Sequence, residues 1–188
     1  SWLRLLDRWG VEPVAAFPAF DRLIAAYSDE SRHYHNPEHL SEMFRVASRL
    51  QDGVSDYATT QLAIWYHDAV YDSRARDNEA RSAALAREAL SGLAVPEPTI
   101  HRVEAMILAT AKHLPTGDAD TRVLLDADLA ILGAEPKRYD RYAADVRREY
   151  AWVGEAAYRS GRAALLESFL KREAIYQTAR MREMGEAT

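Results

Sequence analysis

The clearest chemical signal in the sequence is a group of histidines near its start. Three of the six histidines, His33, His35 and His39, lie within seven residues. Asn36 is a favourable N-cap and Pro37 a favourable first helical residue, so a helix is predicted with His39 in its opening turn. His39 then shares an apolar face with Leu40, Met43, Phe44 and Ala47. An inward-facing imidazole needs a partner, although any one of these histidines alone also fits a capping or hydrogen-bonded core residue.

A histidine and an aspartate, His67 and Asp68, lie at the end of a nearly all-apolar helix predicted over residues 62–70. Each buried polar group without a partner costs about 1–3 kcal/mol, and a buried charge costs more. Coordination of a metal ion would satisfy both side chains.

Two further carboxylates, Asp126 and Asp128, interrupt an apolar helix predicted over residues 123–132. Helical geometry gives Asp128 only leucine and isoleucine neighbours on its own face, whereas Asp126 shares a face with Arg122. We therefore expect Asp128 to need a cation, and Asp126 to pair with Arg122 or to support the site from behind.

Together these residues offer imidazole nitrogens and carboxylate oxygens, a donor set that suits one divalent ion of Mn, Fe, Ni, Co, Mg or Zn. The chain has no cysteine, which excludes thiolate zinc sites, disulfides and cysteine nucleophiles.

The elements that must position these groups are predicted to be helices throughout. The 33 alanines exceed the 24 valine, isoleucine and threonine residues together, and apolar residues recur at helical spacing almost everywhere. We predict one all-α domain over residues 1–188, a bundle of seven to nine helices, with the metal core in about 32–133 and C-terminal helices in about 136–182. A helix is predicted from Tyr139 to Ala157, and a second follows a break at Ser160-Gly161.

The net charge of −5 argues against a nucleic-acid duplex or an anionic membrane as partner, because both attract a concentrated positive field. No apolar run approaches the length of a membrane span. We expect a cytoplasmic monomer or homodimer.

The motifs resemble those of the HD superfamily of metal-dependent phosphohydrolases, which combine a histidine, a His-Asp pair and a distant aspartate. Tyr34-His35-Asn36-Pro37-Glu38-His39 is similar to the Tyr-His-Asn-x-x-His segment of cyclic-nucleotide phosphodiesterases, and Ala127-Asp128-Leu129 matches their Ala-Asp-Leu. A closer resemblance, along nearly the whole chain, is to bacterial proteins of similar length that are predicted HD-type phosphohydrolases. It rests on His33 to Asn36, Ala63 to Asp68, Asp77 to Glu79 with Ser82-Ala83, and Asp126 to Leu129 with Leu132-Gly133.

The resemblance implies a single HD-type helical domain in which His39, His67, Asp68 and Asp128 bind the metal and His35 is the general acid. The substrate would be a small phosphomonoester or phosphodiester, possibly a nucleotide, attacked by metal-activated water.

Further roles in this reaction are predicted for residues outside the ligand set. Glu79, with Asp72, would accept a proton or orient the ligands, although Glu79 equally suits an ordinary first helical turn. Arg32 and His113 are the candidates for binding the substrate phosphate. Four tyrosines of the C-terminal half fit a base-binding pocket or, by their helical spacing, the core: Tyr139, Tyr142, Tyr150 and Tyr158.

Three alternatives stay open at this point. The chain fits a non-catalytic regulatory module that keeps the metal and binds a nucleotide. Di-iron oxygenase chemistry would need more ligands, for which only His113, Asp72 and Asp126 are available. A purely structural helical domain would leave the buried charges unexplained.

Overall fold

The computed structural model describes residues 1–186 and is helical throughout, with no strand in that range. The predicted all-α class is therefore confirmed. The last two residues of the predicted domain lie outside the described range. The ten α-helices and two short 3-10 helices are α1 (Trp2–Asp7), α2 (Pro13–Tyr27), α3 (Pro37–Leu50), η1 (Gln51–Gly53), α4 (Tyr57–Tyr66), α5 (Asn78–Gly92), α6 (Glu97–Thr110), α7 (Ala119–Leu129), η2 (Ala130–Gly133), α8 (Pro136–Glu149), α9 (Glu155–Leu170) and α10 (Ala179–Gly185).

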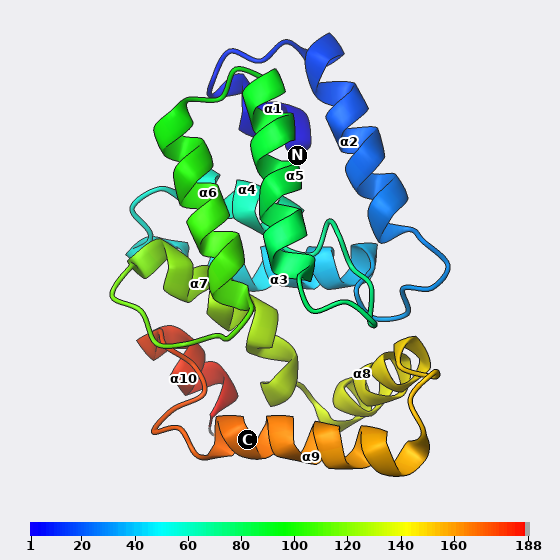
Figure 1. The fold of residues 1–188 in the computed structure, drawn as a ribbon. Helices are drawn as coiled ribbons and strands as arrows, with labels where there is room; N and C mark the ends of the chain where they lie inside the picture. The colour runs from blue at the N-terminus through cyan, green and yellow to red at the C-terminus, as the bar shows by residue number, and fades with distance from the viewer. Residues whose placement is uncertain (187–188) are drawn as a thin grey trace.

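The helices form two groups, one above the other in Figure 1. In the upper group, α2, α5 and α6 run side by side in the view while α3 and α4 cross beneath them, and α7 leads downward to α8, α9 and α10. The main core is built from fully buried apolar side chains of the upper group and α7, among them Leu6, Tyr27, Met43, Leu62, Ile107 and Leu124. A smaller cluster of Tyr34, Ile131, Tyr142 and Val146 joins α8 to the segment before α3.

The C-terminal helices differ from the prediction in where they break. The helix expected to continue to Ala157 ends at Glu149, and the predicted break at Gly161 lies inside α9. The early end is stabilised by Arg147, whose guanidinium donates to the carbonyl oxygens of Tyr150, at 2.7 Å, and Val153, at 3.1 Å. These bonds satisfy carbonyls that leave the helix, so periodicity alone placed the boundary too late.

The carboxylate of Asp126 joins the C-terminal segment to α7 by hydrogen bonds. The expected pairing of Asp126 with Arg122 is not formed. Its carboxylate accepts hydrogen bonds from the backbone nitrogens of Gln177, at 2.7 Å, and Thr178, at 2.8 Å, and from the Thr178 hydroxyl. Because these donors lie some fifty positions along the chain, the helical neighbours of Asp126 gave no sign of them. Both of its oxygens are turned toward α10 and away from Asp128's partners.

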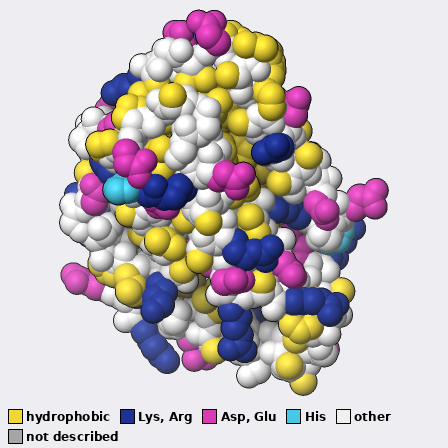
Figure 2. Space-filling model, turned by 45° about the horizontal axis from the view of Figure 1, so that its top comes forward, with side chains coloured by type: hydrophobic (Ala, Val, Ile, Leu, Met, Phe, Trp, Pro, Cys, Tyr) yellow, Lys and Arg dark blue, Asp and Glu magenta, His cyan; other side chains and the backbone are white. Residues whose placement is uncertain are grey.

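Charged side chains of both signs are interspersed on the face drawn in Figure 2. Within residues 1–186, no helix is both long enough and apolar enough to cross a membrane.

Candidate metal centre

The predicted ligands lie at the ends of three helices, and these helix ends converge. His39 stands in the first turn of α3, which the Asn36 side chain caps by accepting from the backbone nitrogens of Glu38 and His39, as predicted. His67 is the residue that ends α4, and Asp128 lies in the last turn of α7. Because α3 and α4 both pack against α7, their ends meet at one point.

The donor atoms of His39, His67 and Asp128 lie within 4.8 Å of one another and could hold a metal ion. The two Nε2 atoms of the histidines are 3.3 Å apart. Oδ1 of Asp128 lies 3.3 Å from Nε2 of His39 and 3.8 Å from Nε2 of His67. The structure thus groups Asp128, and not Asp126, with the two histidines, although Asp126 is the more buried carboxylate.

The chemistry of these three groups fits a cation. Nδ1 of His67 lies 2.9 Å from the carbonyl oxygen of Ile64, which can only accept, so Nδ1 carries a hydrogen and Nε2 is the ring nitrogen available to an ion. This bond to the second ring nitrogen is the usual arrangement for a metal-binding histidine. Two imidazole nitrogens at about 2.0–2.1 Å from one ion with tetrahedral angles lie about 3.3 Å apart, as His39 and His67 do.

The charges at the centre favour a positive ion as well. Burial alone would lower the pKa of His67, but the carboxylates of Asp68 and Asp128 raise it to about 9. Burial would likewise raise the pKa of Asp128, and the hydrogen bonds from His113 and His39 hold it well below its ordinary value. Two carboxylates and two buried imidazoles thus create a site that attracts positive charge.

Asp68 lies at the edge of this group. Its Oδ2 is 3.1 Å from Nε2 of His67, although it is not among the three residues whose donors mutually converge. The backbone around Asp68 is held by Arg32, whose guanidinium donates to the carbonyl oxygens of Asp68, at 2.6 Å, and Ala69, at 3.1 Å. The buried Arg32 side chain is therefore engaged in positioning the His-Asp turn, and it is not among the residues that line the cavity, which corrects its predicted role in binding phosphate.

His35 stands beside the centre and pairs with the buried carboxylate of Glu149. Its Nδ1 lies 2.7 Å from Oε2 of Glu149, and its Nε2 points toward Oδ2 of Asp68 at 4.0 Å. Burial alone would lower the pKa of His35, but Glu149 and the charge of Asp68 outweigh it and raise the pKa. In return, burial would raise the pKa of Glu149, and the bonds from His35 lower it to about 2. The pair therefore favours the charged form of His35.

His113 holds the other oxygen of Asp128. Its Nε2 lies 2.8 Å from Oδ2, the oxygen that does not face His39 and His67. The residue follows α6 in the left-handed backbone region with φ of +47°, which is uncommon for a residue other than glycine. Arg172 supports this turn by donating to the His113 carbonyl oxygen at 2.5 Å. His113 thus orients Asp128. The sequence predicted only that it binds the substrate phosphate.

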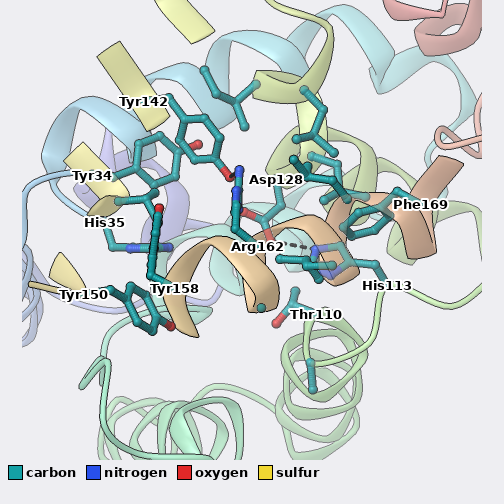
Figure 3. A pocket seen from close by; sticks show the side chains of 18 of the residues that line it. Tyr34, His35, Thr110, His113, Asp128, Tyr142, Tyr150, Tyr158, Arg162 and Phe169 are labelled. Atoms are coloured by element: carbon teal, nitrogen blue, oxygen red, sulfur yellow. Dashed lines mark hydrogen bonds and ion pairs between the residues drawn. The ribbon is translucent and has the colours of Figure 1, made fainter. Parts of the chain in front are cut away.

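A cavity of about 520 Å³ opens beside these groups (Figure 3). His35, His113 and Asp128 lie along it, and the remaining walls come largely from α8 and α9. Tyr142, Tyr150 and Tyr158 line it, and Tyr142 also belongs to the smaller buried cluster, so both interpretations of the helical spacing apply in part.

No protein-family model, no curated protein and no solved structure matches this chain.

Other predicted residues are not brought to the centre. Glu79 is a partly exposed residue in the first turn of α5, and Asp72 is exposed and accepts from the backbone nitrogen of Arg74. Neither lines the cavity. His33 is partly buried and its carbonyl accepts from the Asn36 side chain, whereas His101 is exposed and pairs with Glu97.

Glu149 is the functional candidate that the sequence reasoning missed. It also accepts hydrogen bonds from the backbone nitrogens of Tyr34 and His35 and from the Tyr71 hydroxyl, so it organises the segment that carries the histidines. A signal was present: Glu149 falls three residues after Val146 and seven after Tyr142, on the apolar face of the predicted helix. A charged residue on such a face needs a partner, by the argument applied to Asp128.

Proposed function

We propose that this protein is a metal-dependent phosphohydrolase of the HD type that acts on a small phosphomonoester or phosphodiester, such as a nucleotide. The observation that carries the proposal is the convergence of His39, His67 and Asp128 beside a cavity that Asp128 and the imidazole of His35 line. A cation to hold phosphoryl oxygens and an acid to protonate the leaving oxygen are the two requirements of such a hydrolysis. A cytoplasmic location and a monomeric or homodimeric state belong to the same proposal.

In this proposal Asp68 joins His39, His67 and Asp128 as the fourth ligand of one divalent ion. Its Oδ2, 3.1 Å from Nε2 of His67, supports that assignment. When bound, such an ion acidifies a water molecule and polarises a phosphoryl oxygen.

His35 protonates the leaving oxygen of the ester. Glu149 fixes Nδ1 of the ring, and Nε2 is thereby left to face the centre. The ring also stacks on Tyr71, with centroids 4.0 Å apart, which keeps it from rotating away. His113 holds Asp128 and Arg32 holds the backbone of Asp68, so both act as positioning residues.

The principal alternative is a regulatory module that keeps the metal and binds a nucleotide without turnover. The His35–Glu149 pair favours hydrolysis, because an ion-holding centre has no need of an imidazole outside its ligand set whose ring a carboxylate orients toward it. Di-iron chemistry would recruit Asp126 and Asp72, whose carboxylates are engaged elsewhere.

The test combines metal content with turnover. The protein is reconstituted separately with Mn, Fe, Ni, Co, Mg and Zn and assayed on nucleoside monophosphates, cyclic nucleotides and simple phosphomonoesters. We expect His67→Ala to lose the metal and the activity together. His35→Gln should keep the metal while its kcat falls by about 100-fold or more. His101→Ala, an exposed histidine, is the matched control.

Two results would contradict the proposal. Full metal occupancy in His67→Ala would show that the centre is elsewhere. A metal-loaded wild type that is stabilised by a nucleotide but hydrolyses none of the esters would identify the regulatory module instead.

A further inference from the structure

The half of the cavity formed by α8 and α9 has no role in the proposed function so far. That function uses the His and Asp groups of α3, α4 and α7 together with the His35–Glu149 pair. The opposite walls carry the rings of Tyr142, Tyr150 and Tyr158 and one cation, Arg162, which reaches into the cavity in Figure 3.

Arg162 has no carboxylate partner in the part of the chain that is described. Its guanidinium donates to the Tyr142 hydroxyl at 2.6 Å and lies over that ring, 4.9 Å from the centroid. Two other arginines of the same region differ, because Arg138 pairs with Glu42 and Arg147 with Glu155. The positive charge of Arg162 therefore has no carboxylate beside it among the described residues and borders the cavity, an arrangement that favours an anion.

A short run of aromatic rings connects this cation with the metal centre. The Tyr142 ring is 4.5 Å from that of Tyr34, and the Tyr34 ring is 4.8 Å from that of His39. Arg162 and Asp128 border the same cavity. One small anionic ligand can therefore be flanked by the centre and by Arg162.

The remaining wall is apolar and aromatic. Tyr150 and Tyr158 lie with their ring centroids 6.3 Å apart, and Val153 and Leu165 also line the cavity, whereas Phe169 lies across it beside His113 (Figure 3). Tyrosine and phenylalanine faces accommodate flat rings, which gain contact area there and lose little hydration. The shape and chemistry of this wall suit the organic part of an ester rather than its phosphate.

We infer that Arg162 binds the anionic group of the substrate and that the wall formed by Tyr150, Tyr158 and their apolar neighbours selects a phosphate ester with a flat, largely apolar body. This inference rests on the proposed function, because it treats the ligand of the cavity as the substrate. Arg162 carries a fixed positive charge and a planar fork of donors that match phosphate oxygens.

The test uses two phosphonates that cannot be hydrolysed, phenylphosphonate and methylphosphonate, and measures their binding to the manganese-loaded protein by calorimetry. The two probes share the anionic group and differ in the ring. We expect Arg162→Gln to weaken both by about 10- to 100-fold, as loss of a charge-assisted hydrogen bond does. Tyr158→Ala should weaken phenylphosphonate alone, by about tenfold.

Two further variants separate binding from structure. Arg159→Gln changes an exposed arginine on the same helix, paired with Glu155, and should leave both affinities unchanged. Arg162→Lys keeps the charge and should recover part of the lost affinity for methylphosphonate, which a merely structural role would not predict. Manganese content and helical content are measured for every variant, so that a misfolded protein is recognised. If Arg162→Gln does not fold, the affinities of Arg162→Lys for the two phosphonates decide whether Arg162 binds the anionic group.

The inference is overturned if the manganese-loaded wild type binds neither phosphonate, or if Arg162→Gln binds both as the wild type does. It is also overturned if Tyr158→Ala lowers the affinity for both probes equally, because the phenyl ring of phenylphosphonate would then not contact the wall. Failure of the proposed function looks different: phosphonates would bind through Arg162 while no phosphate ester is hydrolysed.

Discussion

The two oxygens of Asp128 have different partners, and that division organises the centre at the scale of single residues. Oδ1 faces His39 and His67, whereas Oδ2 accepts from His113. The carboxylate cannot rotate without losing one of these contacts. His113 therefore affects any ion held by Asp128 without itself belonging to the three converging groups.

We predict that His113→Gly lowers the affinity for the metal by about 10- to 100-fold. Glycine adopts the left-handed backbone of this position freely, so the change removes the imidazole without adding backbone strain. Metal titration of the purified variant measures the effect, with His101→Ala as the control. An unchanged affinity would mean that His113 does not hold Asp128 in the folded protein.

At the scale of elements, α10 is held against the turn after α7 by a close approach of two glycines. A Cβ atom on Gly133 would lie 2.7 Å from the Gly185 carbonyl oxygen and 2.8 Å from the Tyr176 hydroxyl. The Tyr176 hydroxyl itself bonds to the carbonyl oxygen of Leu129 at 3.3 Å. Together with the bonds of Asp126 to Gln177 and Thr178, this contact fixes the last helix beside the segment that carries Asp128.

Gly133→Ala should lower the free energy of unfolding by about 1–3 kcal/mol, because the added methyl group overpacks this contact. Denaturant unfolding gives the loss, and limited proteolysis of residues 171–178 should become faster as α10 is displaced. The comparison variant is Gly161→Ala in α9, where a Cβ atom meets nothing within 4 Å. It should be neutral or stabilise by about 0.5–1 kcal/mol. Equal behaviour of the two variants would argue against the close approach.

At the scale of the whole molecule, a buried carboxylate joins three distant elements. Asp120, in the first turn of α7, accepts from the backbone nitrogens of Ser55, at 2.6 Å, and Asp56, at 3.0 Å. Arg102 of α6 donates to it at 2.5 Å. Burial would raise the pKa of Asp120, but the bonds from Ser55, Arg102 and Asp56 lower it below its ordinary value of 3.8.

A lowered pKa in the folded state makes Asp120 a source of acid sensitivity. Its contribution to stability is fully present above pH 3.8, the ordinary value, and is lost as the pH falls through the lower folded pKa. At neutral pH, Asp120→Asn should reduce the free energy of unfolding by about 1–3 kcal/mol. The gap between wild type and variant should narrow below pH 3.8, as unfolding curves across the acid range can measure. A difference in the free energy of unfolding that stays constant with pH would contradict the prediction. The control Asp140→Asn, at an exposed position, should unfold with the same free energy as the wild type.

The sequence by itself determined the helical class, the cap of α3 and the donors of the centre. Each of these follows from interactions over three or four residues. Asn36 caps the helix that it begins, and His39 and His67 are buried histidines that need a partner. The type of residue and its helical face were enough to select His39, His67 and Asp128, which the structure brings together, and they selected Asp68 as well, which lies at the edge of the group.

Which distant residues these helices contact was decided only by the tertiary structure. Glu149 reaches His35 across 114 positions, and Asp126 holds residues more than fifty positions away. Arg32 is occupied by the carbonyl oxygens after His67, and Tyr142 of α8 and Tyr158 of α9 border a cavity. Helical periodicity shows which side of a helix is apolar, but whether that side meets another helix, a cavity or a distant chain end depends on how the helices pack together.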